Sequence, residues 1–311
     1  MEENHSPIPR VSIGLAVYNG ERYLREAIDS ILAQTFTDFE LVISDNASTD
    51  KTEEICRDYA AKDSRIRYSR NPENIGGANN ENLVFKLSRG EYFRLAAHDD
   101  VLAPRLLEKC VEVLERDPSV VLCVSMIDDI DENGKYLKTT SPDRGISDKL
   151  VERFSKLSRR GHSCEETYGL MRSDIYRKTR LQLNYTDSDR TLLCELALYG
   201  RFHMIPEVLF YKRYHPGNYY LDWRSRMVWF TPSNMGKIVF PNWMQFKDYL
   251  DTVGRVPLNT KDKLLCYGVI WGPWLFRSAK WLLKDLLVAG YMALHSQKWR
   301  QQRYQKTMNW E

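Results

Sequence analysis

Apolar and polar positions alternate along the first 126 residues in blocks that predict strands and helices in turn. Short apolar runs rich in β-branched residues are typical of strands, whereas apolar residues every three or four positions are typical of helices. The predicted strands are 11–17, 40–45, 65–70, 91–97 and 119–126. The predicted helices are 22–34, 48–62, 77–90 and 104–118. Since strands and helices follow one another, we expect an α/β protein with a mostly parallel sheet and helices on both of its faces.

Local signals indicate where two of these helices begin. Ser48 or Thr49, ahead of acidic residues, predicts a capping box at the start of the 48–62 helix. Pro104 stands at the first position of the 104–118 helix, which tolerates proline because no backbone donor is needed there. We therefore expect these residues to start their helices.

The pattern is less regular after residue 126. Residues 129–137 predict a hairpin that turns at Asn133–Gly134, because this dipeptide is typical of tight turns. We further expect a strand that runs into a helix over 163–176, a helix over 188–200 and paired strands over 201–215.

Tryptophan and basic residues accumulate beyond residue 220. On predicted helices they include Trp271, Trp274, Trp281, Trp299, Arg277, Lys280, Lys284, Lys298, Arg300 and Arg303. The stretch 264–276 has 13 uncharged residues, against the ~20 that a membrane-spanning helix requires. Three roles stay open for this region: peripheral contact with a membrane, a helical cap packed on the rest of the chain, or a dimer interface.

Polar residues follow the ends of several predicted strands. Tyr18 and Asn19 follow the first strand, Asp45 ends the second, and Asp99 and Asp100 end the fourth. In a sheet of this type ligands bind at the carboxyl ends of the strands. We therefore expect one crevice to receive all of these side chains.

The adjacent carboxylates of Asp99 and Asp100 need an explanation, because like charges repel. A hard divalent cation such as Mg²⁺ or Mn²⁺ would remove that repulsion, and it usually bridges to substrate phosphates. The alternative is a solvated turn or a helix N-cap a few residues before Pro104. The convergence of other polar residues on the same crevice favours the cation.

The composition narrows the class of protein. The chain has 311 residues, 43% of them hydrophobic and 28% charged, which is ordinary for a soluble globular protein of one large domain or two. The net charge of +3 is too small to indicate a nucleic-acid partner. The six cysteines form no CxxC pair and several lie in apolar runs, so we expect reduced core residues in a cytoplasmic protein. The N-terminus has no apolar signal-peptide region.

Two segments carry a resemblance to a known family. "VSIGLAVYNGERYLREAIDSILAQTFTDFELVISDNASTDKT" and "NPENIGGANNENLVFKLSRGEYFRLAAHDDVLAP" resemble the opening and the middle of family 2 glycosyltransferases. The resemblance runs from about residue 11 to about residue 218. It implies a GT-A fold, with a nucleotide-binding half over 11–126 and an acceptor half over 127–220 of a 1–220 catalytic domain, followed by a helical extension over 221–311.

The resemblance implies a set of donor-binding residues. The nucleotide sugar would lie against Val17, Tyr18, Asn19, Glu21, Asp45, Asn74, Gly76, His98, Asp99 and Arg213. Asp45 would accept N–H groups of the nucleobase, as a carboxylate can, unless it is a turn residue. Glu81 stands before Asn82 where the family usually has a basic residue, so a contact from Glu81 to the diphosphate is in doubt.

The resemblance also implies metal ligands. Ala97, His98 and Asp99 take the positions of the family's Asp-x-Asp motif, so the metal would rest on Asp99, Asp100 and the diphosphate. His215 would meet the metal or the diphosphate, or else be a surface histidine. His98 is either a further ligand or a contact at the rim of the site.

A catalytic base is implied as well. Asp189 takes the position of the base that heads a helix, although Ser188 replaces the usual glutamate and Asp187 is a rival. The alternative is that Asp189 caps its helix. Tyr168 and Gly169 match a strand that lines the acceptor pocket, or they are ordinary core residues.

These inferences together predict an inverting glycosyltransferase that depends on Mg²⁺ or Mn²⁺. It would move a sugar from a nucleotide-diphosphate sugar to a hydroxyl of a glycan, a lipid-linked glycan or another acceptor. Two rivals remain: a sugar nucleotidyltransferase, for which "VYNGERY" offers only a weak phosphate loop, and a non-catalytic carbohydrate-binding or scaffold protein. If the C-terminal region binds a membrane, we expect the protein at its inner face.

Overall fold

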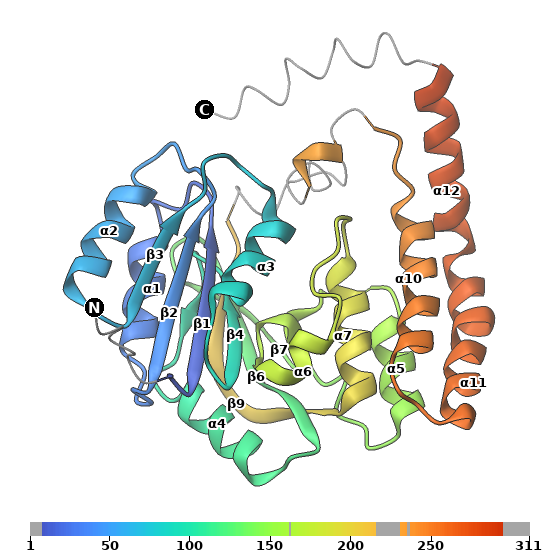
Figure 1. Cartoon of the computed structure of the whole chain (residues 1–311), viewed down its shortest axis with the longest axis horizontal. Coiled ribbons are helices and arrows are strands. Elements are labelled where there is room, and N and C mark those ends of the chain that lie inside the picture. The colour runs from blue at the N-terminus through green and yellow to red at the C-terminus, as the bar shows by residue number, and fades with distance from the viewer. Residues whose placement is uncertain (1–7, 162, 216–230, 235–236, 295–311) are drawn as a thin grey trace, which may run out of the picture.

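The computed structural model describes residues 8–161, 163–215, 231–234 and 237–294. Within this part of the chain, nine strands form one mixed sheet in the order β3-β2-β1-β4-β8-β6-β9-β5, with β7 attached to β6 (Figure 1). The strands are β1 (Val11–Val17), β2 (Phe39–Asp45), β3 (Ile66–Arg70), β4 (Tyr92–Ala96), β5 (Val101–Leu102), β6 (Val120–Ile130), β7 (Tyr136–Thr140), β8 (Leu170–Arg172) and β9 (Arg201–Arg213). Strands β1 to β4 pair in parallel, as do β6 and β9, whereas β8 joins the two groups by antiparallel pairing.

Helices cover both faces of the sheet, as predicted. They are α1 (Leu24–Leu32), α2 (Thr52–Lys62), α3 (Gly77–Leu87), α4 (Leu106–Arg116), α5 (Leu150–Ser158), η1 (Glu165–Tyr168), α6 (Ser173–Lys178), α7 (Ser188–Tyr199) and η2 (Pro232–Asn234). One hydrophobic core lies between the sheet and α1, α2 and α4, and a second lies between the other face and α3, α5, α6 and α7. Side chains of β4 alternate between them: Tyr92 and Ala96 enter the first, Phe93 and Leu95 the second.

The prediction of paired strands over 201–215 is wrong, because this stretch forms the single strand β9. β9 pairs in parallel with β6, and its register shifts where Ser125 faces Ile205 and Met126 faces Val208. Pro206 and its neighbour are therefore the extra residues of a bulge rather than a turn. A bulge is where a strand can hold a proline, which lacks the donor for the ladder.

Both predicted helix starts are also wrong by a few residues. α2 begins at Thr52 behind Lys51, and no capping box forms. The Ser48 backbone N–H instead donates to the Asp45 carboxylate over 2.8 Å, which makes a turn after β2. α4 begins at Leu106, and Pro104 lies in the turn before it, where its carbonyl accepts the backbone N–H of Thr35.

The predicted hairpin is confirmed by the antiparallel pair β6 and β7. One carboxylate oxygen of Asp131 accepts the backbone N–H groups of Asn133 and Lys135, both over 2.9 Å. Gly134 has a φ of +83°, a left-handed conformation that glycine adopts without strain. The turn therefore forms for the reason that the sequence indicates.

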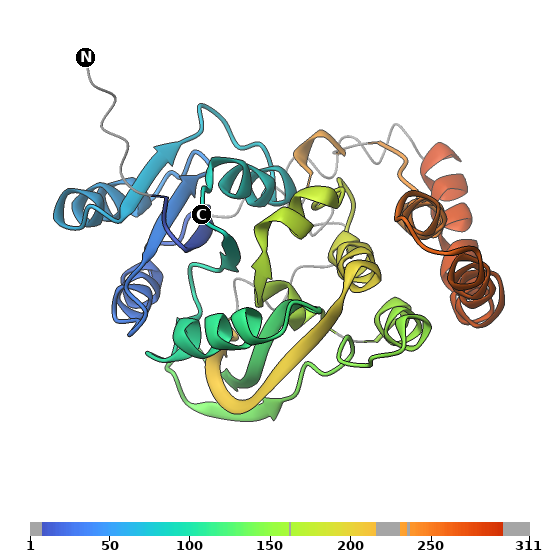
Figure 2. The same cartoon turned by 60° about the horizontal axis from the view of Figure 1, so that its bottom comes forward.

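The C-terminal helices pack as a layer outside α5 and α7. They are α10 (Pro241–Arg255), α11 (Thr260–Val269), a π-helical turn η3 (Ile270–Trp274) and α12 (Leu275–Leu294). Both cartoon views show them side by side, at the end of the molecule away from α1 and α2 (Figures 1 and 2). Of the residues that the structure describes, no helix is both long enough and apolar enough to cross a membrane.

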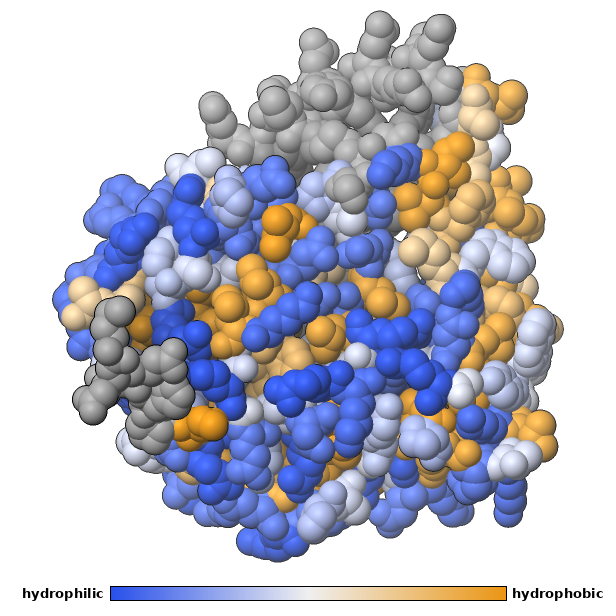
Figure 3. All heavy atoms as spheres, in the orientation of Figure 1, coloured by the Kyte–Doolittle hydropathy of each residue, from blue (hydrophilic) through white to orange (hydrophobic). Residues whose placement is uncertain are grey.

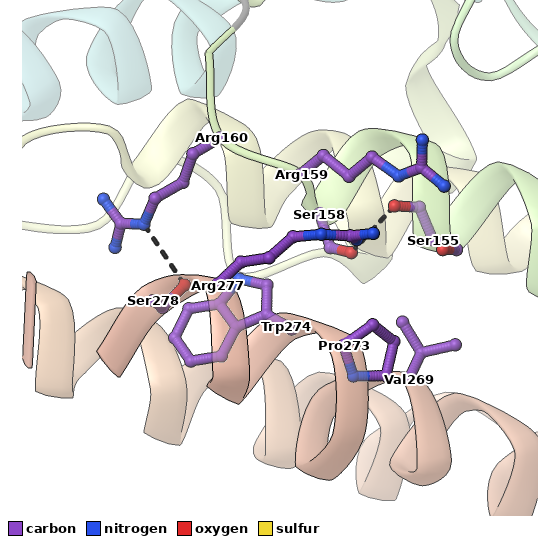
Figure 4. Close-up of a pocket in the computed structure, with 9 residues that line it drawn as sticks. All are labelled: Ser155, Ser158, Arg159, Arg160, Val269, Pro273, Trp274, Arg277 and Ser278. Carbon is purple, nitrogen blue, oxygen red and sulfur yellow. Dashed lines mark hydrogen bonds between the residues drawn. The ribbon is translucent and has the colours of Figure 1, made fainter. Parts of the chain in front are cut away.

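A buried contact joins this layer to α5. Trp274 is 4% exposed and belongs to the second core. Arg160, just after α5, reaches across the same contact and donates a hydrogen bond to Ser278 (Figure 4). It also donates to the side chains of Asn242 and Gln245. The described part of the C-terminal region is thus a packed cap on its inner side.

Candidate active site

The loops that follow β1 and β2 hold each other through hydrogen bonds. The Asn19 backbone N–H donates to the Ser48 hydroxyl over 3.0 Å, and the Thr49 N–H donates back to the Asn19 side chain over 2.8 Å. The Lys51 N–H likewise donates to the Glu21 carboxylate over 2.9 Å. Asn19 has a φ of +51°, a conformation that asparagine tolerates better than most residues. Both predicted donor-binding side chains therefore fix the shape of the crevice.

The same loop also packs against His98. A Cβ atom on Gly20 would lie 2.8 Å from the His98 ring, so only glycine lets the two segments approach this closely. Val17, at the end of β1, is buried, and Tyr18 lies exposed at the rim. His98 thus contacts the loop after β1, at the edge of the crevice.

Asp45 is fully buried at the end of β2. One of its oxygens accepts the Ser48 N–H, and the other accepts the Tyr68 hydroxyl over 3.0 Å and lies 3.4 Å from the Arg70 guanidinium. Each carboxylate oxygen has two acceptor positions, so these contacts leave some capacity for a base. Recognition of a nucleobase by Asp45 stays a prediction.

A small pocket opens between the end of β1 and the start of α3. It encloses about 320 Å³ of empty space including its mouth, and its walls are Ala16, Val17, Tyr18, Asn46, Asn74, Gly77, Asn80 and Glu81. The Asn46 amide donates to the Asn74 side chain, which also accepts the Gly76 N–H, both over 2.9 Å. Gly76 has a φ of +86°, which only glycine adopts freely. The predicted donor loop at Asn74 and Gly76 therefore borders a real pocket.

The carboxylate pair after β4 meets the end of β9. A carboxylate oxygen of Asp99 lies 3.0 Å from the Nε2 atom of His215. Asp100 accepts the backbone N–H of Arg213 over 2.8 Å, and the Arg213 guanidinium donates to the Asp99 carbonyl over 2.9 Å. Asp99 and Asp100 are only 7% and 6% exposed. Residues more than a hundred positions apart are thus brought together, as the resemblance implies.

The two carboxyl groups of this pair differ electrostatically. Burial works against ionisation of Asp99, but the hydrogen bond with His215 holds its pKa below the usual value. Burial and the negative charge of Asp99 together raise the pKa of Asp100 well above the usual value. One carboxylate and one carboxylic acid therefore lie side by side.

These residues allow a test of whether a divalent cation fits. Among the residues that the structure describes, no group of three or more His, Cys, Asp or Glu side chains forms a closed metal site. Asp99 and His215 do supply an oxygen and a nitrogen 3.0 Å apart. Mg²⁺ is commonly held by one or two protein ligands together with substrate phosphates, so this pair fits a cation that needs a bound diphosphate.

Asp189 lies in the first turn of α7, and Asp187 precedes that helix. Asp187 is exposed and makes no capping hydrogen bond, while the Ser188 hydroxyl donates to the Leu183 carbonyl over 2.9 Å. Asp189 accepts the Arg190 backbone N–H over 2.7 Å and is more enclosed than Asp187. Burial and the charge of Asp187 raise the pKa of Asp189 to about 6. A carboxylate with such a pKa is suited to accept a proton near neutral pH.

Tyr168 links the two ends of the site. Burial, and then the negative charges of Asp100, Glu81, Asp99 and Asp189, raise the pKa of its phenol well above the usual value. These four carboxyl groups therefore all lie within electrostatic range of one side chain, although they come from different parts of the chain. The predicted acceptor residue Tyr168 is thus electrostatically coupled both to the carboxylate pair after β4 and to the predicted base.

Gly169, the second predicted acceptor residue, is explained by packing. A Cβ atom there would lie 2.9 Å from the Cys123 carbonyl of β6, closer than real contacts allow. The glycine lets the chain after η1 approach the sheet, and a role in acceptor binding stays a prediction.

Glu81 is the residue whose position the sequence did not indicate. It lines the pocket beside Val17 and Tyr18, and its charge acts on Tyr168 and Tyr176. The available signal was an acidic residue where the resemblance leads us to expect a basic one.

A Rossmann-like sheet with a polar pocket at the carboxyl ends of its parallel strands, and a carboxylate pair beside it, defines a GT-A type protein. Residues 12–180 match the family model described as glycosyl transferase family 2. The chain therefore belongs to glycosyltransferase family 2, and the resemblance seen in the sequence is confirmed.

Curated relatives agree with this assignment. An uncharacterised glycosyltransferase of Methanocaldococcus jannaschii is 32% identical over 206 residues, which are 65% of this chain and 69% of that protein. One of Rickettsia typhi is 34% identical over 213 residues, which are 67% of this chain and 64% of that protein.

Solved structures share the fold. TarS 1–349 of Staphylococcus aureus, in complex with UDP-GlcNAc, has a TM-score of 0.53 at 17% identity, over 93% of this chain and 92% of that one. The mannosyltransferase PcManGT of Pyrobaculum calidifontis, in complex with GDP-Man and Mn²⁺, has a TM-score of 0.52 at 17% identity, over 94% and 89% of the two chains. At this identity the likeness establishes a common fold.

Proposed function

We propose that this protein is an inverting glycosyltransferase that moves a sugar from a nucleotide-diphosphate sugar to an acceptor hydroxyl. The observation that carries the proposal is the meeting of Asp99 and Asp100 with Arg213 and His215, together with the polar pocket that the loops after β1 and β2 border. Structures of the same fold hold UDP-GlcNAc and GDP-Man, which supports a nucleotide sugar as the donor.

In this mechanism one end of the site binds the donor nucleotide and the other accepts the proton of the acceptor. The nucleotide lies along the loops after β1 and β2, and the diphosphate lies near Asp99 and His215. Asp189 accepts the proton of the acceptor hydroxyl as that oxygen attacks the anomeric carbon, and the nucleoside diphosphate leaves from the opposite side. A single displacement of this kind inverts the configuration at that carbon.

Mg²⁺ or Mn²⁺ is the cofactor that we propose for this reaction. Asp99 and His215 would hold it, with Asp100 beside them. When bound, such a cation neutralises charge on the leaving diphosphate. Arg213 supports the same corner, because its backbone and guanidinium fix Asp100 and Asp99 in place.

The loop after β1 favours this function over a sugar nucleotidyltransferase. A phosphate-binding loop needs backbone N–H groups that are open to the ligand. Here the N–H groups of Asn19, Gly20 and Glu21 already donate to Ser48, Thr52 and Asp50 over 2.8–3.0 Å. A non-catalytic scaffold would have no use for an acidic group with the raised pKa of Asp189.

The test of this function is a panel of donors. Thermal shift with UDP-glucose, UDP-galactose, UDP-GlcNAc, GDP-mannose and dTDP-rhamnose, with and without Mn²⁺, should identify a stabilising donor. That donor should then be hydrolysed slowly in the absence of an acceptor. A panel without any shift, or a bound donor that is never turned over, would overturn the proposal.

We also propose that the outer face of α12 contacts a membrane surface that carries anionic lipid. Phe276, Leu283, Leu287 and Leu294 are 56–87% exposed, and their spacing places them on one face of the helix. Figure 3 shows this apolar surface over α12. The exposed basic residues Arg277, Lys280 and Lys284 flank it, which matches the charge of anionic headgroups.

Co-sedimentation with phosphatidylglycerol vesicles tests the membrane contact. The full chain should pellet at low salt and less at high salt, since screening weakens the attraction of basic residues to the lipid. Leu287→Glu should remain in the supernatant, whereas Leu137→Glu, a control on the exposed hairpin strand β7, should pellet like the unchanged protein. If the unchanged protein does not pellet at low salt, the membrane contact is wrong.

A further inference from the structure

Glu81 is an acidic residue in a pocket where a basic one was expected. It lies on α3 and lines the pocket together with Val17, Tyr18 and Asn80. An ionised carboxylate there would repel the two negative charges of a diphosphate at short range. The side chain is therefore badly suited to the diphosphate contact that a basic residue would make.

One oxygen of this carboxyl group lacks a partner. The Oε2 atom of Glu81 is buried and makes no hydrogen bond with any residue that the structure describes. A buried polar atom without a partner is unfavourable and rare in folded proteins. Because the side chain borders the pocket, a ligand in the pocket is the natural partner.

The side chain is also held close to the proposed base. Asn82, the next residue, donates to the Gln182 carbonyl over 2.8 Å and accepts the Gln182 N–H over 3.0 Å. This pair of bonds ties α3 to the segment before α7, and so places Glu81 near Asp189. The pocket is therefore lined by the loops after β1 and β2 and by Glu81, on which the charge of Asp189 acts.

The charge state of Glu81 indicates what it would bind. Burial, and then the negative charge of Asp189, raise the pKa of Glu81 to about 8. Near neutral pH it is then an uncharged carboxylic acid, which can both donate and accept a hydrogen bond. That combination matches a sugar hydroxyl, which also does both.

We propose that Glu81 recognises the sugar of the donor, through a hydrogen bond between its carboxyl group and a hydroxyl of the sugar that is transferred. The inference rests on the proposed function, because a sugar lies between diphosphate and base only in a glycosyltransferase. It makes Glu81 a residue that determines which sugar is accepted, rather than part of the diphosphate site.

Calorimetry on three variants of the full chain tests this role. The ligands are the nucleotide sugar that stabilises the unchanged protein most in the panel above and the corresponding nucleoside diphosphate. Glu81→Leu removes the hydrogen bond, Glu81→Gln keeps an uncharged group of the same shape, and Glu73→Gln is a control at an exposed position in the loop before α3. Circular dichroism checks that each variant is folded.

We expect Glu81→Leu to bind the nucleotide sugar about tenfold more weakly, which corresponds to about 1.4 kcal/mol, and the nucleoside diphosphate within about twofold of the unchanged protein. Glu81→Gln and Glu73→Gln should keep both affinities within about threefold, because an amide still pairs with a hydroxyl. The Leu variant should also discriminate less between glucose and galactose donors.

Three results would overturn the inference while leaving the proposed function intact. Equal weakening of nucleoside diphosphate and nucleotide sugar in Glu81→Leu would place Glu81 at the diphosphate. Equal losses in Glu81→Gln and Glu81→Leu would mean that an ionised carboxylate is needed, as for a cationic sugar. Unchanged binding in Glu81→Leu would mean that no sugar contact exists. The proposed function fails separately, when the unchanged protein binds no donor in the panel.

Discussion

Two pairs of acidic residues lie at opposite ends of the same site, and their surroundings differ. Asp99 and Asp100, after β4, have Arg213 and His215 against them. Glu81 on α3 and Asp189 on α7 form no ion pair with any residue in the described part of the chain. Basic residues therefore form hydrogen bonds with the first pair, whereas no basic side chain that the structure describes pairs with the second.

This difference suits the two pairs to different tasks. One pair is suited to bind charged groups, and the other to transfer a proton. In the first pair, the hydrogen bond with His215 holds the pKa of Asp99 low, so this carboxylate stays ionised and can hold a cation together with a diphosphate, while the pKa of Asp100 is raised. Where burial and a like charge act instead, the pKa rises toward neutral pH, which suits a group that accepts or shares a proton. One site can therefore use four similar carboxyl groups in different ways.

The largest effect should come from the end of the site that holds Glu81 and Asp189. Asp189→Asn should lower turnover by about 10²–10⁴, the size of a general-base contribution, while donor affinity stays unchanged. Single-turnover kinetics and calorimetry measure the two quantities. Asp187→Asn is the matched control, because Asp187 is exposed and precedes the helix. A large loss in Asp187→Asn with near-normal turnover in Asp189→Asn would exchange their roles.

At the end that holds Asp99 and Asp100, a substitution should weaken binding rather than slow turnover. Asp99→Ala should weaken the Mn²⁺-dependent binding of the donor nucleotide by roughly tenfold to a hundredfold, the range seen when groups around a metal are removed. Asp143→Ala, an exposed aspartate outside the site, is the control. Calorimetry with and without Mn²⁺ gives the measurement. Unchanged Mn²⁺-dependent binding in Asp99→Ala would show that no metal rests there.

The raised pKa of Asp189 predicts how activity depends on pH. A base must be deprotonated to act, so turnover should fall below pH about 6, by about tenfold for each further pH unit. The decline should be absent from the small residual activity of Asp189→Asn. Turnover that stays constant down to pH 5 would contradict Asp189 as the base.

The sequence predicted the end with Asp99 and Asp100 better than the end with Glu81 and Asp189. Asp45, Asp99 and Asp100 could be placed together because parallel strands bring their carboxyl ends to one edge of a sheet. The meeting of Asp99 with His215 was available only from the resemblance, because nothing local relates residues 116 positions apart. That contact depends on the whole course of β9 beside β6.

The position of Glu81 in the site could not be predicted from the sequence pattern. Its sequence neighbours predict only a helix, and its closeness to Asp189 depends on the hydrogen bonds between Asn82 and Gln182. The reading of 201–215 as paired strands failed for a similar reason, because the bulge at Pro206 exists only against its partner β6. Tertiary contacts determine both the position of Glu81 and the bulge in β9, and the periodicity of the sequence contains no information about such contacts.

The smallest effect that we predict concerns the contribution of Glu81 to the stability of the folded protein. Glu81 interacts electrostatically with Asp189, Tyr168 and Tyr176, and the phenols stay protonated because burial raises their pKa values. An ordinary glutamate pKa of 4.5 in the unfolded chain, against about 8 in the folded protein, means that folding takes up a proton between these pH values. The stability that this group allows is fully present below pH 4.5 and is lost as the pH rises toward 8.

Glu81→Gln removes this titration, so it should stabilise the ligand-free protein near pH 7.5 by on the order of 1–3 kcal/mol and have little effect near pH 5. Thermal unfolding from pH 5 to 8 measures the difference, which should be a few degrees in Tm at the upper end. Glu73→Gln, whose side chain is exposed, should follow the unchanged protein at every pH. Parallel curves for Glu81→Gln and the unchanged protein would show that Glu81 is ionised in the folded state.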